Sequence, residues 1–208
     1  MDSDPLLRKS VILTASFVAL LWGIKLWEWV SDWPLVTLGV YPLSTKNLAG
    51  IVLGPLIHGS FVHIATNTFG VLILGTALLY GFPKSRWRVL ATIWVLSGLG
   101  VWLFGRPSYH IGASGLTHGL FFFLLVVSVL RRDRRSIALM MMASLLFGGM
   151  FWGVLPSEQH VSFEYHLFGG AAGVLAALLF WRTDPKPAEK RYDWENEDDG
   201  APPDDTSH

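Results

Sequence analysis

Six apolar stretches constrain this chain more than any other feature of its sequence. They cover roughly residues 10–30, 56–80, 87–104, 114–130, 136–155 and 166–182. An α-helix needs about 20 apolar residues to cross the ~30 Å hydrocarbon core of a bilayer. Only 15% of the 208 residues are charged, whereas soluble proteins carry about a quarter. The sequence therefore predicts an all-α membrane protein with six transmembrane helices.

The basic residues are sorted by side of the membrane. Thirteen of the 16 Lys and Arg residues precede the first stretch, separate the second from the third or the fourth from the fifth, or follow the sixth; the exceptions are Lys25, Lys46 and Arg106. By the positive-inside rule both termini should lie in the cytoplasm, and an even number of spans agrees with this. We expect a multi-pass protein of a bacterial inner membrane.

The hydrophilic parts of the chain differ in kind. Residues 1–182 should form one membrane domain, and residues 183–208, with nine acidic residues, should form a disordered cytoplasmic tail. The long loop 31–55 is half apolar, so we expect it to carry short helices or to lie in the membrane surface. The chain has no cysteine, which excludes disulfide and thiolate chemistry. Its net charge of zero gives no reason to expect a nucleic acid partner.

Four polar residues within the apolar stretches all fall at the same end of their predicted helices. Polar groups inside a bilayer are costly and usually mark function. The second, fourth and sixth stretches run in the same direction, and their outer halves carry His63, Asn67, Ser114 and His166. His63 and Asn67 are four residues apart and share a helix face. Counted from Leu56, Asn67 should lie about 16 Å into the membrane. A hydrogen-bonding role between helices is the simpler explanation of this pair.

A serine and a histidine in this set have the chemistry of a nucleophile and its base. Ser114 stands in the run Gly112-Ala113-Ser114-Gly115 at a predicted helix start, where backbone N–H groups are free to bind an anion. Gly169 and Gly173 form a smooth stripe for close approach to another helix, with His166 one turn above. A neutral imidazole beside a serine hydroxyl is the pair that performs acyl transfer. The pattern indicates hydrolysis inside a membrane.

Together these residues resemble the motifs of rhomboid intramembrane serine proteases. Three motifs occur in the family's order: His58-x-Ser60-x-x-His63-x-x-x-Asn67, Gly112-Ala113-Ser114-Gly115 and His166-x-x-Gly169-x-x-x-Gly173. The run Trp152-Gly153-Val154-Leu155-Pro156 is similar to members of the family as well, and the resemblance covers roughly residues 10–182. It implies a six-helix rhomboid-like bundle with a water-filled cavity open to the outer face and capped by the loop 156–164.

The resemblance also implies roles for the matched residues. Ser114 would be the nucleophile and His166 the general base, with no aspartate to complete a triad. His63, Asn67 and the backbone N–H of Ser114 would form the oxyanion hole, and His58 and Gly112 would support the site. The substrates would be transmembrane segments of other membrane proteins, in contact with the lipid bilayer, and no cofactor or metal ion would be needed.

Two positions depart from the family's pattern. His118 stands four residues after the serine, where many members have an aromatic residue packed against the catalytic imidazole. It could stack on His166 or hydrogen-bond to it. The first outer loop lacks the Trp-Arg pair of many members. Thr117 is an alternative hydroxyl nucleophile.

Three other functions compete with proteolysis. The chain could be a non-catalytic rhomboid-like protein that binds client membrane helices, although such proteins should lack the serine or the histidine. A metal site could use the histidines, but His58 and His63 are about 140° apart around a helix and no H-E-x-x-H motif is present. A transporter would need buried carboxylates, which the second to sixth stretches lack. His110 and His160 should be solvated loop residues.

Overall fold

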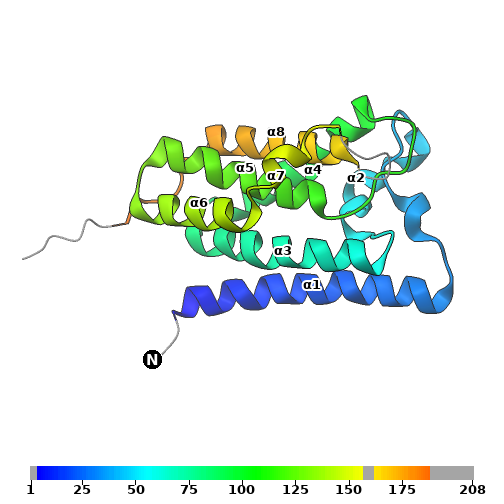
Figure 1. Cartoon of the computed structure of the whole chain (residues 1–208), viewed down its shortest axis with the longest axis horizontal. Helices are drawn as coiled ribbons and strands as arrows, with labels where there is room; N and C mark the ends of the chain where they lie inside the picture. Colours follow the sequence, from blue (N-terminus) through cyan, green and yellow to red (C-terminus); the bar gives the residue numbers. More distant parts are fainter. Residues whose placement is uncertain (1–3, 157–161, 188–208) are drawn as a thin grey trace, which may run out of the picture.

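The computed structural model describes residues 4–156 and 162–187, and its named elements are all helical. Six longer helices form the bundle: α1 (Pro5–Ser31), α3 (Phe61–Gly81), α4 (Arg86–Phe104), α5 (Ser114–Arg131), α6 (Arg134–Phe147) and α8 (Phe163–Phe180). Short elements fill the connections: η1 (Leu35–Leu38), η2 (Thr45–Asn47), α2 (Gly50–Leu53), η3 (Gly54–Leu56) and α7 (Met150–Gly153). The long helices lie side by side along one axis (Figure 1).

Five of the six predicted spans are single long helices. Among the described residues α1, α3, α4, α5 and α8 are long and apolar enough to cross a membrane. The predicted span 136–155 differs, because α6 ends at Phe147 and α7 begins at Met150 after Gly148 and Gly149. The 14 residues of α6 extend about 21 Å, which is less than the hydrocarbon thickness. The all-α membrane bundle is confirmed, and its fifth predicted span is interrupted by a glycine pair.

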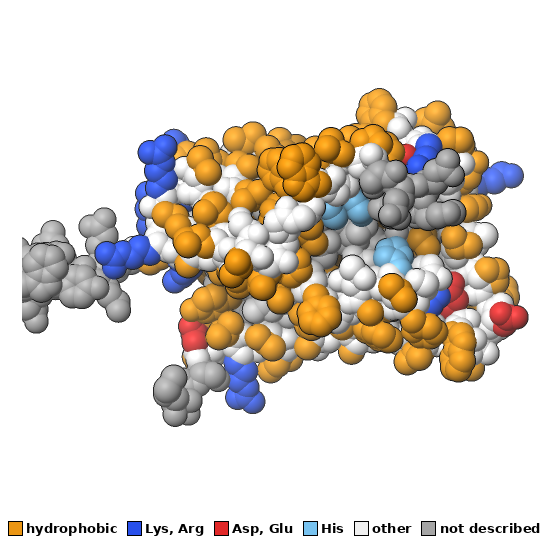
Figure 2. Space-filling model, viewed as in Figure 1, with side chains coloured by type: hydrophobic (Ala, Val, Ile, Leu, Met, Phe, Trp, Pro, Cys, Tyr) orange, Lys and Arg blue, Asp and Glu red, His pale blue; other side chains and the backbone are white. Residues whose placement is uncertain are grey.

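One end of the bundle carries most of the basic residues, and we call it the basic end. It holds the start of α1, the α3–α4 and α5–α6 turns and the residues after α8 (Figure 1), and Figure 2 shows Lys and Arg side chains gathered there. The basic residues of these segments are Arg8, Lys9, Lys84, Arg86, Arg88, Arg131, Arg132, Arg134, Arg135, Arg182 and Lys186. The opposite end, which we call the site end, contains the starts of α3, α5 and α8. Both outer segments of the described chain therefore lie at the basic end, and the predicted cytoplasmic position of this end stays a prediction.

Local sequence explains where the helices begin. Asp4, Ser60, Asp133 and Ser162 precede α1, α3, α6 and α8, and each side chain accepts a hydrogen bond from a backbone N–H in the first turn. Such caps satisfy donors that a helix start leaves unpaired. The start of α5 is different: its cap position is Ala113, which has no side-chain cap bond. The donors at the start of α5, beginning with Ser114, are thus left for other partners.

The helix α5 is the centre of the bundle. It contacts α3, α4, α6 and α8, and 67% of its apolar window is buried, more than in the other four candidate spans. Lipid is as apolar as a leucine side chain, so close packing rather than burial from water holds membrane helices together. The buried cluster around α5 joins residues of five long helices, including Leu74, Leu78, Phe82, Ile93, Leu116, Leu120, Phe123, Leu124, Ala143 and Ala176.

The contact between α5 and α8 is a backbone-to-backbone contact. A Cβ atom added to Gly169 would collide with the carbonyl group of Gly115, and one added to Gly173 would collide with that of Gly119. Close approach of this kind is typical of small residues spaced four apart in membrane helices. The predicted Gly169–Gly173 stripe is confirmed, and a matching pair on α5 receives it.

A buried polar network at the basic end moves the predicted domain boundary. Asp184 is 4% exposed, and its carboxylate accepts bonds from the backbone N–H groups of Lys84 and Ser85 and from the Ser85 hydroxyl. Arg131 donates to the carbonyl of Asp184 at 2.7 Å and pairs with Asp133 at 2.7 Å. The boundary predicted at 182/183 is therefore wrong, because the membrane domain extends at least through this network. Residues 188–208 of the predicted tail lie outside the described residues.

The loop 31–55 does carry short helices, as expected. Its middle is tied to the loop before α5 by two backbone hydrogen bonds between Val40 and His110, of 3.0 and 2.8 Å. Two indole N–H groups of α4 also donate to its carbonyls: Trp94 to Val52 at 3.0 Å and Trp102 to Ser44 at 3.1 Å. The loop is thus bonded to the bundle at the site end. Its position in the membrane surface remains a prediction.

The α5–α8 contact predicts that adding one methyl group at Gly169 destabilises the protein, whereas adding one at an open glycine does not. Gly169→Ala should destabilise the bundle by about 1–3 kcal/mol, because overpacking against backbone forces the helices apart. Gly23→Ala is the matched control, since a Cβ there meets nothing within 4 Å and alanine favours helix. Unfolding of both variants by a denaturing detergent in mixed micelles measures the difference. Equal stability of the two variants would contradict the close contact.

Candidate active site

A cavity of about 600 Å³ lies toward the site end between α3, α5, α7 and α8. Figure 2 shows histidine side chains exposed on a hollowed part of the surface, surrounded by apolar side chains. The cavity is lined by Gly59, Ser60, Val62, His63, Thr66, Asn67, Tyr109, Ile111, Ser114, Thr117, His118, Met150, Ser162 and His166. The four polar residues singled out in the sequence, together with His118, therefore meet in one cavity.

The segment before Ser114 is fixed by two backbone hydrogen bonds. The N–H of Gly112 donates to the carbonyl of Gly54 at 2.9 Å, and that of Ala113 donates to His58 Nε2 at 3.3 Å. Gly112 has φ of +108°, a conformation that only glycine adopts without strain. His58 is 1% exposed and does not line the cavity. Gly112 is thus part of the segment that presents Ser114, and His58 is hydrogen-bonded to this segment.

His63 and Asn67 lie against that same segment. A Cβ added to Gly112 would lie 2.6 Å from His63 Nε2 and 3.7 Å from Asn67 Nδ2. The Asn67 amide donates to the carbonyl of His63 at 3.2 Å, as expected for residues four apart on a helix. Two nitrogen-bearing side chains therefore surround the backbone just before Ser114. A side chain other than hydrogen at Gly112 would displace them.

His166 has a defined tautomer. Its Nδ1 lies 2.9 Å from the carbonyl oxygen of Gly153 in α7. A carbonyl oxygen only accepts, so Nδ1 carries the proton, and the lone pair of the neutral ring is on Nε2. The bond also joins α7 to α8 and limits rotation of the ring. The motif that contains Gly153 was noticed in the sequence without this role.

His118 stacks on His166, as one of the two predicted arrangements had it. The ring centroids are 3.9 Å apart, and the planes differ by 7°. His118 Nδ1 donates to the carbonyl of Ser114 at 2.8 Å, whereas its Nε2 is buried without a partner among the described residues. Parallel rings on α5 and α8 thus extend the contact between the two helices up to the cavity.

Two local interpretations of the sequence are corrected by the structure. The helix that carries His63 begins at Phe61, not near Leu56, so Asn67 lies only about 9 Å from its start. His58 precedes that helix, and its ring meets the His63 ring edge-on with centroids 5.1 Å apart. The argument that these two histidines cannot meet assumed a helix through both and was wrong. Most of the predicted capping loop 156–164 lies outside the described residues.

His110 was expected to be solvated, and this too was wrong. It is 1% exposed. Its Nε2 lies 3.0 Å from the carbonyl of Arg106, which must accept, so Nδ1 accepts the hydroxyl proton of Ser162 at 2.6 Å. Ser162 caps α8 four residues before His166 and lines the cavity. His160 lies outside the described residues.

A buried ion pair lies beside His110 and was also missed. Glu164 is 5% exposed and pairs with Arg106, whose Nε is 3.3 Å from Oε1. The sixth apolar stretch was started at His166, but α8 begins at Phe163 and includes this carboxylate. Ser162 was the available signal, because serine is a preferred residue at the cap of a helix start. These residues fix the start of α8 on the loop before α5.

No group of three or more His, Asp or Glu side chains within residues 4–156 and 162–187 has an arrangement that could hold a metal ion. The stacked pair and the His58–His63 pair each bring two imidazoles together. Several of their nitrogens are engaged with backbone groups. The described arrangement suits hydrogen bonding and proton transfer.

Burial of His110 predicts a pH-dependent stability. Burial lowers the pKa of His110 below its usual value, although the bond to the Arg106 carbonyl and the Glu164 charge act in the opposite direction. The unfolded chain, with a pKa of about 6.5, then binds more protons, so stability is complete above that value and falls as the pH drops toward the lowered pKa.

Thermal unfolding of the detergent-solubilised protein between pH 7.5 and 5 should measure this effect. We expect the melting temperature of the wild type to fall more steeply with decreasing pH than that of His110→Gln, which cannot take up the proton. Parallel curves for the two proteins would show that His110 titrates alike in the folded and unfolded states.

Comparisons with known proteins place the chain among its relatives. A family model described as a rhomboid domain matches residues 45–183, which include α2 to α8 and the whole cavity. An uncharacterised protein of Mycobacterium tuberculosis and one of Mycobacterium bovis are each 38% identical over 187 residues, covering 85% of this chain and 77% of the relative. An uncharacterised protein of Mycobacterium leprae is 35% identical over 182 residues, covering 82% and 71%. With its apolar helices and this match, the chain is an integral multi-pass membrane protein that belongs to the rhomboid family.

Proposed function

We propose that this protein is an intramembrane serine protease that cleaves membrane-spanning segments of other proteins, with Ser114 as nucleophile and His166 as general base. The observation that carries the proposal is the tautomer of His166. Its Nδ1 proton is engaged by Gly153, so Nε2 is the basic nitrogen of a side chain that shares a cavity with Ser114. In serine hydrolases a carboxylate commonly fixes the tautomer of the histidine. In this proposal the backbone carbonyl of Gly153 fixes it.

The proposed reaction uses one base for both proton transfers. Ser114 Oγ attacks the scissile carbonyl carbon while His166 Nε2 takes the hydroxyl proton. The tetrahedral intermediate then expels the amine, which receives that proton, and leaves an acyl-enzyme on Ser114. A water molecule, deprotonated by the same nitrogen, then attacks the ester carbonyl; the C–Oγ bond breaks, Ser114 Oγ takes the proton from His166, and the carboxylic acid is released. No hydrogen bond joins Ser114 to His166 in the described residues, and such bonds often tighten only when substrate is present.

The negative oxygen of the intermediate would be bound at the start of α5. This helix has no side-chain cap, so the Ser114 N–H is available as a donor. His63 and Asn67 lie on the neighbouring side of Gly112 and would add side-chain donors. Each donor of this kind typically contributes a factor of about 10²–10³ in rate. The Asn67 amide would exchange its bond to the His63 carbonyl for one to the oxyanion.

The form of the substrate follows from the same geometry. A carbonyl within an α-helix is already hydrogen-bonded to the N–H four residues on, so the scissile segment must unwind before attack. The cavity of about 600 Å³ has room for an extended segment and water. We also propose that the basic end faces the cytoplasm, because Lys and Arg are concentrated in cytoplasmic loops.

The proposal predicts that Ser114→Ala and His166→Ala each abolish cleavage of a transmembrane substrate while the protein stays folded in the membrane. Thr117→Ala is the matched control: this hydroxyl lines the same cavity but donates to the Ser114 carbonyl at 3.0 Å. A fluorophosphonate probe should label the wild type at Ser114. Cleavage by either alanine variant, or a label on Thr117, would refute the assignment. A wild type that binds transmembrane segments without cleaving them would instead indicate a non-catalytic rhomboid-like protein.

The stacked ring of His118 generates a separate prediction. Since the rings lie parallel at 3.9 Å, His118→Phe and His118→Tyr should retain most activity. His118→Ala should lose the stack, which for aromatic pairs contributes about 0.5–1.5 kcal/mol and corresponds to roughly two- to twelvefold in rate. Rates and pH profiles of the three variants test this. If His118 shares a proton with His166, both aromatic variants should lose activity. The acid limb of the pH–rate profile should then also shift between the variants and the wild type.

A further inference from the structure

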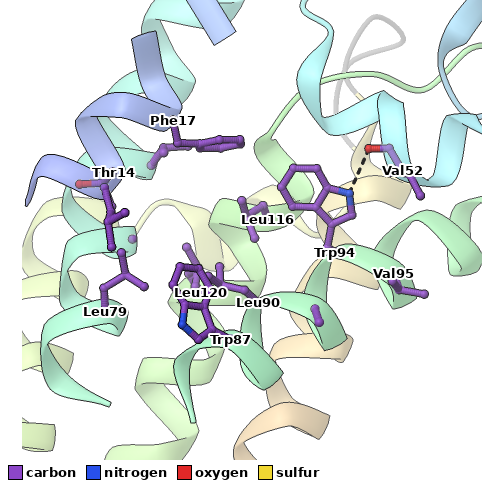
Figure 3. Close-up of a pocket in the computed structure, with 14 residues that line it drawn as sticks. Thr14, Phe17, Val52, Leu79, Trp87, Leu90, Trp94, Val95, Leu116 and Leu120 are labelled. Atoms are coloured by element: carbon purple, nitrogen blue, oxygen red, sulfur yellow. Dashed lines mark hydrogen bonds between the residues drawn. The ribbon is translucent and has the colours of Figure 1, made fainter. Parts of the chain in front are cut away.

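A second cavity, of about 500 Å³, lies between α1 and α4 and shares no lining residue with the first. Figure 3 shows side chains from α1, α3, α4 and α5 pointing into it, with α2 at one end. Its lining consists of Leu13, Thr14, Phe17, Val52, Val71, Gly75, Leu79, Trp87, Leu90, Ala91, Trp94, Val95, Leu116 and Leu120. We call it the α1–α4 groove.

The walls of this groove suit a hydrocarbon. The Thr14 hydroxyl is engaged with the Thr76 hydroxyl at 2.9 Å and with backbone carbonyls of its own helix. The Trp94 indole N–H donates to Val52, as Figure 3 shows. The remaining lining side chains are apolar apart from the indole of Trp87. Few polar groups in the groove are free to bind an occupant, so apolar contact must dominate.

The groove is closed toward the site end and extends to the basic end. At its inner end α2 lies across it through Val52 and the bond to Trp94. From Trp94 the lining continues along α4 to Trp87, in the first turn of that helix and about 10 Å away at 1.5 Å per residue. Leu79, in the last turn of α3, lies at the same end. A polar head attached to an apolar occupant would therefore lie at the basic end.

Arg86 lies at this mouth with a donor to spare. One terminal nitrogen donates to the carbonyl of Leu79 at 3.2 Å, and the guanidinium lies 5.5 Å from the Trp87 ring centroid. Both partners line the groove. Arg86 Nε is buried and has no partner among the described residues, and an unpaired buried donor is destabilising. The side chain as a whole is only half-buried, and its terminal N–H groups are suited to bind a phosphate oxygen.

We propose that the α1–α4 groove binds an acidic phospholipid, with one acyl chain along the apolar walls and the phosphate at Arg86. Basic residues between membrane helices recognise acidic headgroups, and Lys9, Lys84 and Arg88 carry further positive charge at this end. A transmembrane helix, about 10–12 Å across, is wider than an acyl chain, and α2 lies across the inner end of the groove. The bound chain would fill the space that α1 leaves beside α4. This binding does not depend on proteolysis.

Native mass spectrometry of the purified full-length protein tests the proposal. Dioleoyl phosphatidylglycerol and dioleoyl phosphatidylcholine are added in turn, and the dissociation constant of the first bound lipid is measured. We expect about tenfold tighter binding of phosphatidylglycerol, a preference that Arg86→Gln removes. Ala91→Phe, which fills the groove, should weaken both lipids. Inorganic phosphate alone should not compete.

Matched controls separate the site from general lipid contact. Ala19→Phe adds the same ring to an exposed position of α1 outside the groove, and Arg132→Gln removes an exposed charge of the basic end in the α5–α6 turn. Both should bind lipid as the wild type does. Thermal unfolding of each variant confirms that it is folded.

Equal binding of the two lipids, or unchanged binding by Ala91→Phe, would overturn the proposal. The occupant could also be a second copy of the chain, and the absence of native cysteine makes this easy to detect. Ala91→Cys in membranes should stay monomeric under mild oxidation if lipid fills the groove. A disulfide-linked dimer would show that a second copy of the chain, and not a lipid, occupies the groove.

Discussion

The candidate site depends on the contact between the backbones of α5 and α8. Gly115 and Gly169 meet one residue after Ser114 and three residues after His166. The two side chains are thus positioned by helices in direct contact, and no flexible connection separates them. Groups on rigid elements are held more precisely than groups on loops. The His118–His166 stack continues this contact toward the cavity, so the same pair of helices determines the distance between the proposed nucleophile and base.

The surroundings of the site are held by backbone and side-chain hydrogen bonds between segments that are distant in the sequence. Gly54, His58 and Val40 each bond to the segment that leads into α5. His110 and Ser162 connect that segment to the start of α8. A carbonyl of α7 then orients His166. The proposed oxyanion donors and the proposed base are therefore supported by one connected framework rather than by separate local structures.

The periodic features of the sequence predicted the fold, and they predicted which polar residues would lie in one cavity, because they depend on local geometry. The apolar lengths, the glycine stripe on α8 and the position of His118 one turn after Ser114 follow from helix periodicity. The errors arose where tertiary contact decides. His110 was assigned to solvent because its loop position is polar, but its partner Ser162 lies 52 residues away. Asp184 was assigned to an acidic tail, but its bonds to Ser85 make it part of the fold. Hydropathy alone could not show that the apolar residues before Ser60 form a separate turn.

The network of Arg131 and Asp184 has a consequence for how the protein is made. Membrane helices enter the bilayer in the order of translation, and α8 is the last of the long helices described here. Its end is bonded to α5 through the carbonyls of Trp181, Asp184 and Pro185, so the helix can be locked in place only after those residues have left the ribosome. Ser114 is therefore made before α6 and α7 and before its proposed base, which lies in the first turn of α8. A nascent chain would stay inactive toward its own helices and toward neighbouring proteins until its synthesis had passed Pro185.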